Sequence, residues 1–405
     1  MDRTSTVGGG LGARVVGVDV ARALALIGMM LIHVLPRIDE SSGEATVLGL
    51  TAAGRSAALF ALLAGVGLAL LTGGHRPHRE RGTRSRDRRL VVVRALLIVV
   101  IGFVVAAWES QVAIILVHYG LLFLLAVPLL GLGARALAAI ALGWVLLAPP
   151  LLRLVITGLM TDPDYPGEMR LWHSPGLPDL LTRPGLLALD LSVTGYYPLL
   201  IWPAYLIAGL AVGRCDLSRR SVAWTLLGLG AGLAALSAAV SWATLLGTDL
   251  VARLDVYGDG PEAVRADLLT GTLLPVEADP RWFLVAAPHS GSTADLVHTI
   301  GSALLVLGAC LLVASVLTGR RRLLLAPLIG AGAMPLTLYV GHLALLHAWH
   351  VEGWPLHGAD PAPIALGLVV AALAGGGIKA ALGRRGPLEA GVHAAGIAAA
   401  GRHPS

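Results

Sequence analysis

Charged side chains are scarce in this sequence. Asp, Glu, Lys and Arg make up 14% of the 405 residues, hydrophobic residues make up 56%, and the mean hydropathy is +0.77. A soluble chain of this length would need a far more polar surface. Apolar runs of about 20 residues, the length that a bilayer core requires, recur along almost the whole chain. We therefore expect an integral membrane protein without a second, soluble domain.

Cysteines and several catalytic motifs are also rare or missing. The two cysteines, Cys215 and Cys310, fall in a predicted loop and a predicted span, which argues against a structural disulfide. The sequence lacks a P-loop, a dinucleotide fingerprint and a nucleophile elbow, which disfavours ATP-driven transport and soluble hydrolase chemistry. It also lacks an H-E-x-x-H motif, so we expect no metal. The net charge of +5 comes from arginines in short loops, so we expect no nucleic-acid partner.

Hydropathy predicts an all-α, polytopic bundle of about ten membrane-spanning helices. The predicted spans are 15–36, 54–73, 90–109, 113–131, 136–158, 194–213, 222–247, 294–318, 324–348 and 362–382. Eight arginines in the segment 75–94 mark that loop as cytoplasmic, and the other loops on its side also carry Arg or Lys. We therefore expect a multi-pass plasma-membrane protein with cytoplasmic tails at 1–14 and 383–405 around a membrane domain, 15–382.

The first span, which contains "VDVARALALIGMMLIHV", keeps three ionisable residues: Asp19, Arg22 and His33. Residues eleven apart on an α-helix lie within about 20° of one another and about 16 Å apart in height, so Arg22 and His33 share a face. Asp19 has the spacing of an ion pair with Arg22, and Arg37 extends the stripe by one turn. Charges inside a membrane usually face a wet cavity. The alternative is a structural Asp19–Arg22 pair with His33 packed in the core.

Other polar residues gather in the predicted outer half of the bundle. Six of the thirteen histidines lie there, in or next to spans: His33, His118, His289, His298, His342 and His347. Arg55 suits oxyanion stabilisation or binding of an anionic acceptor, and an interfacial anchor is the alternative. Tyr339 shares a helix face with His342, which also fits a hydrogen bond between helices. Ser292 and Asp295 have the spacing of a helix N-cap box, which we favour over a Ser-His-Asp triad.

The first span carries a family resemblance. "GVDVARALALIGMMLIHV" (17–34) resembles the first helix of the transmembrane acyltransferase superfamily, in which an Arg is followed eleven positions later by His or Asn. Further similarity lies in 54–74, 117–130, 195–214, 287–308 and 332–347. The chain is most similar to bacterial heparan-α-glucosaminide N-acetyltransferase-like membrane proteins. Arg22 matches the Arg of this family and His33 its His or Asn.

The resemblance implies an acyltransferase that takes an acyl group, acetyl above all, from cytoplasmic acyl-CoA and delivers it to a sugar or glycan outside. His33 would be the general base or acyl-accepting group, and Arg22 with Asp19 would bind the donor. The expected acceptor-side residues are Arg55, His118, His289, His298, Tyr339 and His342. A transporter or flippase for a polar solute or glycolipid, or a structural membrane protein, remains the alternative. The sequence leaves open O- or N-acylation and whether the protein forms a homo-oligomer.

Overall fold

The computed structural model describes residues 15–39, 41–108, 110–161, 167–256, 258, 260–271, 277–353 and 356–400. Within these residues the chain folds into helices, and extended pairing is limited to an isolated antiparallel bridge between Ile38 and Ala45. The predicted all-α fold is therefore confirmed. The predicted tail 1–14 lies outside the described residues, as does the end of the second tail, 401–405.

The helices follow the chain from α1 to α17, with four short 3₁₀ or π segments between them. Their bounds are α1 (Val16–Ile32), α2 (Val47–Ala52), α3 (Arg55–Leu71), α4 (Arg81–Val105), α5 (Leu116–Ala126), η1 (Val127–Gly131), α6 (Ala134–Thr161), α7 (Leu177–Thr182), α8 (Pro184–Leu189), η2 (Asp190–Thr194), α9 (Pro203–Gly213), α10 (Arg220–Gly247), α11 (Leu250–Leu254), α12 (Pro261–Thr270), η3 (Pro280–Leu284), α13 (Thr293–Val316), η4 (Gly319–Leu325), α14 (Ala326–Gly332), α15 (Pro335–His350), α16 (Pro361–Leu382) and α17 (Pro387–Ala400).

Each of the ten predicted spans contains a helix, but fewer helices are long and apolar enough to cross a membrane. Among the described residues five segments meet that test: Val47–Leu71, Ala134–Thr161, Arg220–Gly247, Thr293–Val316 and Pro361–Leu382. A sixth arises if η4–α14 and α15, which meet at a 68° bend, form one broken span. The predicted helix positions hold, whereas ten crossings and the cytoplasmic side of the termini stay predictions.

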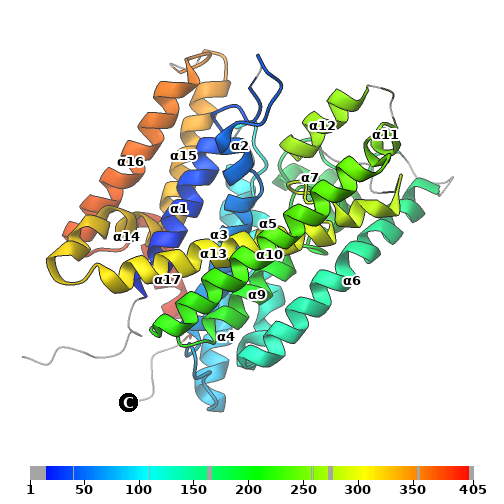
Figure 1. The fold of residues 1–405 in the computed structure, drawn as a ribbon. Coiled ribbons are helices and arrows are strands. Elements are labelled where there is room, and N and C mark those ends of the chain that lie inside the picture. Colours follow the sequence, from blue (N-terminus) through cyan, green and yellow to red (C-terminus); the bar gives the residue numbers. More distant parts are fainter. Residues whose placement is uncertain are drawn as a thin grey trace, which may run out of the picture.

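Tight helix pairs build the bundle, in which α10 lies along α13, α3 along α9 and α14 along α16 (Figure 1). Glycines permit these close approaches. A Cβ added to Gly209 of α9 would lie 1.8 Å from the Leu62 carbonyl oxygen of α3, and one added to Gly332 of α14 would lie 1.8 Å from the Asp19 carbonyl oxygen. The second contact fixes α14 against α1, which carries the predicted stripe of ionisable residues.

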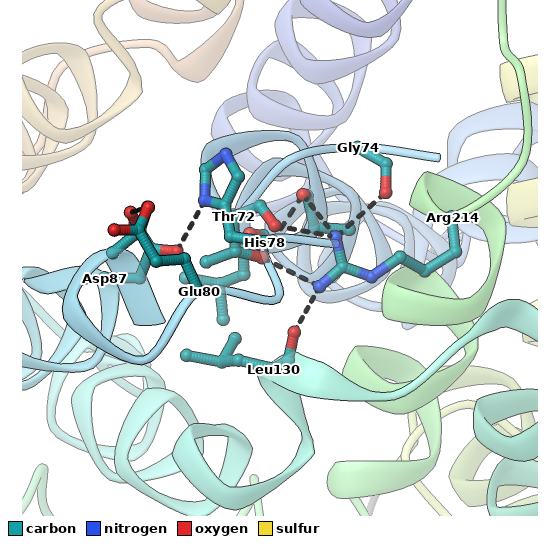
Figure 2. Close-up of polar contacts among 10 residues, drawn as sticks. Thr72, Gly74, His78, Glu80, Asp87, Leu130 and Arg214 are labelled. Carbon is teal, nitrogen blue, oxygen red and sulfur yellow. Dashed lines mark hydrogen bonds and ion pairs between the residues drawn. The ribbon is translucent and has the colours of Figure 1, made fainter. Parts of the chain in front are cut away.

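Arg214, which follows α9, ties several helix ends together (Figure 2). Its Nη1 donates hydrogen bonds to the carbonyl oxygens of Ala69 (2.8 Å), Thr72 (3.2 Å) and Gly74 (2.9 Å), while Nη2 donates to Thr72 Oγ1 (2.8 Å) and the Leu130 carbonyl oxygen. These acceptors are orphan groups at the ends of α3 and η1. By its position just after the predicted span 194–213, Arg214 is one of the loop arginines, but its side chain is buried and holds three elements in register.

The segment after 382, predicted as a tail, contains α17, which packs against α4 and α15. The Glu389 carboxylate accepts hydrogen bonds from the backbone N–H groups of Leu336 (2.7 Å) and Thr337 (3.2 Å) and from the Thr337 hydroxyl (2.6 Å). These N–H groups lie in the first turn of α15, where a carboxylate is favourable. The described part of this segment is thus attached to the bundle.

Candidate active site

The first helix holds Asp19 and Arg22 as the ion pair that their spacing predicts. Arg22 Nη1 lies 3.2 Å from Asp19 Oδ1 and donates a 3.0 Å hydrogen bond to the Gly332 carbonyl oxygen at the end of α14. Asp19 is buried and Arg22 is half-buried. This geometry satisfies the structural alternative, and it also presents a fixed guanidinium between α1 and α14.

A second arginine lies close to Arg22. The charges of Arg22 and Arg94 of α4 act on one another and on the Tyr119 hydroxyl group of α5. Arg94 is exposed, and its guanidinium lies 5.7 Å from the centre of the Phe123 ring. Glu389 and Arg385 also act on Arg94, so three guanidinium groups stand against the carboxylates of Asp19 and Glu389, and the remaining positive charge suits an anionic ligand. Arg94 was not predicted as a site residue, because it is the last of the eight arginines of the segment 75–94, although it interrupts the apolar run VVVRALLIVV.

His33 follows the last turn of α1 and meets His342 of α15. Its Nδ1 lies 3.2 Å from His342 Nε2, and the two rings stack with centres 5.5 Å apart and planes 9° apart. The Tyr339 ring packs edge-on against His342 at 4.9 Å. Because α1 ends at Ile32, the stripe does not continue along the helix to Arg37, which lies in the exposed segment beyond it, but the Arg37 charge still acts on His33 and His289.

A cavity of about 30 Å³, here termed the His33 cavity, lies beside this histidine pair. Its lining includes His33, Tyr339, His289, Tyr197 and Ser56. The volume exceeds the roughly 10–15 Å³ needed for one water molecule. The structure therefore brings four of these polar side chains from α1, α3, α15 and the turn before α13 around a space of water size.

A larger cavity of about 290 Å³, here termed the Trp172 cavity, lies among the segments 106–114, 170–175 and 190–197. Its polar and aromatic lining includes His118, Arg170, Trp172, Asp190, Tyr196 and Tyr197. Both cavities share Tyr197, whose ring contacts His118 at 5.5 Å and His289 at 5.9 Å between ring centres.

Of these six lining residues of the Trp172 cavity, only His118 was predicted from the sequence, whereas His289, which was also predicted, lines the His33 cavity. The available signal was the aromatic and basic residues of "RLWHSP", in the segment between the predicted spans 136–158 and 194–213, and the aromatic residues of "GYYP", at the start of the second of these spans. Long loops that lack regular structure are often binding sites.

Arg55 and His298 contact each other away from both cavities. Arg55 Nε donates a 3.1 Å hydrogen bond to His298 Nε2, and Arg55 Nη1 donates to the Ala53 carbonyl oxygen at 3.2 Å. His298 Nδ1 lies 3.1 Å from the Ala234 carbonyl oxygen, which assigns the ring proton to Nδ1 and leaves Nε2 as the acceptor. The two residues join α3, α10 and α13, and neither lines the two cavities. Their acceptor-binding role stays a prediction.

The predicted cap of α13 is confirmed. Ser292 Oγ accepts a 2.9 Å hydrogen bond from the Asp295 backbone N–H, and Asp295 Oδ2 accepts one of 3.2 Å from the Gly291 N–H. The Ser292 hydroxyl donates to the Val285 carbonyl oxygen, so its proton is committed to the backbone. Among the described residues no group of three or more His, Cys, Asp or Glu side chains is placed to hold a metal ion.

The several helices that are long and apolar enough to cross a membrane define a polytopic membrane protein, in which His33 and His342 are brought together from distant parts of the chain. The sequence matches the family described as heparan-alpha-glucosaminide N-acetyltransferase, catalytic, over residues 14–246. The match covers more than half of the chain, and the chain belongs to this family. No curated protein matches the sequence. The matched region contains Asp19, Arg22, His33, Arg55 and His118 and ends before α13, so the family places the chain among acetyltransferase-like membrane enzymes.

Proposed function

We propose that this protein transfers an acyl group, in the first place acetyl, from cytoplasmic acyl-CoA to a sugar or glycan on the outer side of the plasma membrane. The contact between His33 and His342 carries the proposal, because it supplies an oriented imidazole beside a cavity. Family membership supports the acetyl donor. The neighbouring arginines support a donor with phosphate groups.

The His33–His342 contact favours one arrangement of protons. A neutral imidazole has one N–H donor and one acceptor nitrogen. We assign the donor to His33 Nδ1 and the acceptor to His342 Nε2, because His33 Nε2 then keeps its lone pair. When His33 Nε2 takes a proton, His342 stabilises the resulting imidazolium through the same bond, as an orienting partner does for a catalytic histidine.

The direct reaction balances with His33 as the general base. The acceptor hydroxyl or amine attacks the thioester carbonyl carbon while His33 Nε2 takes its proton. A C–O or C–N bond forms, the C–S bond breaks, and His33 returns the proton to the CoA sulfur. In the covalent alternative His33 Nε2 attacks the thioester and the thiolate leaves; the acceptor then attacks the acyl-imidazole, the acyl C–N bond to His33 breaks, and the acceptor's proton neutralises the thiolate. Trapping an acyl group on His33 by acid quench and mass spectrometry separates these two routes.

The donor end of the proposal uses Arg22 and Arg94. A planar guanidinium presents several N–H donors to a phosphate, and two of them near Tyr119 give a positive region between α1, α4 and α5. Along α1, Arg22 lies eleven residues, or about 16 Å, before His33. A donor with charged phosphates at one end and a thioester at the other suits that separation.

Release of CoA by the purified protein tests the function. In lipid nanodiscs with acetyl-CoA and a glycan mixture, an acyltransferase releases free thiol and yields acetylated sugar of matching amount. A transporter or structural protein releases no thiol, which would overturn the proposal.

The sidedness is tested separately in a background with Cys215→Ser and Cys310→Ser. There, Glu80→Cys should resist an impermeant thiol reagent in intact cells and Ser42→Cys should react.

A further inference from the structure

The walls of the Trp172 cavity combine an aromatic platform with buried polar groups. The Arg170 guanidinium carbon lies 4.8 Å from the ring centre of Trp172 and 4.6 Å from that of Tyr196, so the cation is stacked between two rings. Arg170 is buried, whereas Trp172 is 83% exposed. One face of the Trp172 ring is thus held by Arg170, which fixes its orientation, and most of its surface stays accessible.

His118 makes the strongest case for a ligand. Its side chain lines this cavity, the residue is 2% exposed, and neither Nδ1 nor Nε2 has a hydrogen-bond partner among the described residues. Buried polar groups in native proteins are normally hydrogen-bonded, so an unpaired pair of ring nitrogens requires a partner. A ligand hydroxyl would supply one, because a hydroxyl both donates and accepts.

Asp190 and the neighbouring charges define the polarity of the ligand. Asp190 is buried at the cavity, and its Oδ2 accepts a 2.9 Å hydrogen bond from the Leu171 N–H. His173 is engaged by Asp179 at 3.0 Å. Among the described lining residues the remaining charges are Arg170 and Asp190, which are opposite in sign and act on one another. A neutral ligand with several hydroxyl groups therefore suits the walls better than an anion.

We propose that the Trp172 cavity binds one neutral pyranose ring of the acceptor, with a ring face on Trp172 and hydroxyl groups on His118 and Asp190. One face of a pyranose presents C–H groups that pack on an aromatic ring, while its rim presents hydroxyls. The volume, about 290 Å³, lies at the lower end of small-molecule sites, which suits one sugar ring. The inference rests on the proposed function, because it locates and classifies the acceptor.

Tyr197 connects this site with the chemistry. It lines both the Trp172 cavity and the His33 cavity, and its hydroxyl donates a 3.1 Å hydrogen bond to the Ala113 carbonyl oxygen. The Tyr197 side chain therefore lies in the wall between the proposed sugar site and the His33 cavity.

Sugar binding without donor tests the inference. Protein in nanodiscs is titrated with methyl β-glucopyranoside, followed by saturation-transfer NMR, with sorbitol as a polyol that has hydroxyls but no ring face. We expect saturable binding of the glucoside and at least tenfold weaker binding of sorbitol. Trp172→Ala should weaken glucoside binding at least tenfold, Trp172→Phe should largely restore it, and Trp224→Ala, on the exposed face of α10, should leave it unchanged.

Absence of saturable glucoside binding would overturn the site. Equal glucoside binding by wild type and Trp172→Ala would also overturn it, because Trp172 would then only anchor its loop in the lipid headgroups. Retained acetyl-CoA affinity shows that each variant is folded. The proposed function can fail separately from the sugar site. If sugar binding depends on Trp172 but no CoA is released, acyl transfer is excluded and the sugar site stands. If CoA is released and the KM for the acceptor is the same in Trp172→Ala as in wild type, only the sugar site is excluded.

Discussion

His33 Nδ1 and His342 Nε2 lie 3.2 Å apart with their rings nearly parallel, although 309 positions separate them in the chain. This contact joins the end of α1 to the middle of α15, and α15 is the second half of the bent segment whose first half, α14, holds Arg22 through Gly332. Both ends of the predicted face of α1 therefore meet the same segment. A shift of α14 and α15 would alter the donor and transfer ends together.

Loss of His342 should impair catalysis without abolishing donor binding. His342→Ala removes the partner that orients and stabilises protonated His33, so we expect turnover to fall about tenfold to a hundredfold, less than the full contribution of an acid–base group. The pH–rate profile should shift as well, because the acidity of His33 would change, and His342→Gln should restore part of the rate. His350→Ala is the matched control, since its Nδ1 contacts only the Leu346 carbonyl oxygen of its own helix. An unchanged pH profile would make His342 a packing residue.

Substitution of Arg22 should weaken the donor complex. Arg22→Lys keeps the charge but loses the planar fork, and we expect acetyl-CoA affinity to fall about tenfold, equivalent to about 1.4 kcal/mol. Equilibrium binding of labelled acetyl-CoA measures this, with the exposed Arg135→Lys as the control. If donor affinity is the same in both variants, Arg22 serves only as the structural partner of Asp19.

Arg214 should contribute to stability and not to chemistry. Arg214→Ala leaves buried carbonyl groups at the ends of α3 and η1 without donors, and hydrogen bonds to charged groups contribute about 1.5–3 kcal/mol each. We expect a lower unfolding temperature in nanodiscs and a normal acetyl-CoA affinity in the folded fraction. Arg219→Ala, which removes an exposed ion pair with Asp216, should change the unfolding temperature little. Equal effects of the two substitutions would contradict this assignment.

Acceptor affinity should depend on Asp190. Burial raises the pKa of Asp190 to about 6, against the opposing effects of the Leu171 N–H bond and the charges of Arg170 and His173, while Asp179 adds to the rise. As the pH falls through about 6, the Asp190 carboxylate is protonated and accepts fewer hydrogen bonds. The affinity for the glucoside should therefore fall. Protonation favours the folded form here, because the folded pKa exceeds the unfolded one, so lost binding would not reflect unfolding. Asp190→Asn should flatten this pH dependence; an unchanged profile would exclude Asp190 from the site.

Local features of the site could be predicted from the sequence. The (i, i+3) spacing gave the Asp19–Arg22 pair, and the S-x-x-D spacing gave the cap of α13. These contacts arise within one helix or one turn, where periodicity fixes geometry.

Contacts between distant segments could not be predicted in this way. Periodicity does not determine which helices pack together, so it cannot distinguish His342 from the other candidate histidines as the partner of His33. The break before Pro335 divides a single hydropathic run into two helices. The burial of Arg214 could not be predicted, because hydropathy does not distinguish a buried arginine from an exposed one. The Arg170–Trp172 stack lies in a segment without helical periodicity, so the sequence does not indicate the contact.

Single-turnover acetyl transfer by wild type, His33→Ala and His33→Asn tests the central claim most directly. Free CoA and acetylated sugar are measured with donor saturating, and donor affinity is measured separately as the check on folding. With His33 as the base or acyl acceptor, His33→Ala should slow transfer by about 10²- to 10⁴-fold while donor binding persists. High activity in His33→Asn alone would make His33 an orienting residue. Wild-type transfer by His33→Ala would contradict the account, because α1 would then contribute no catalytic group.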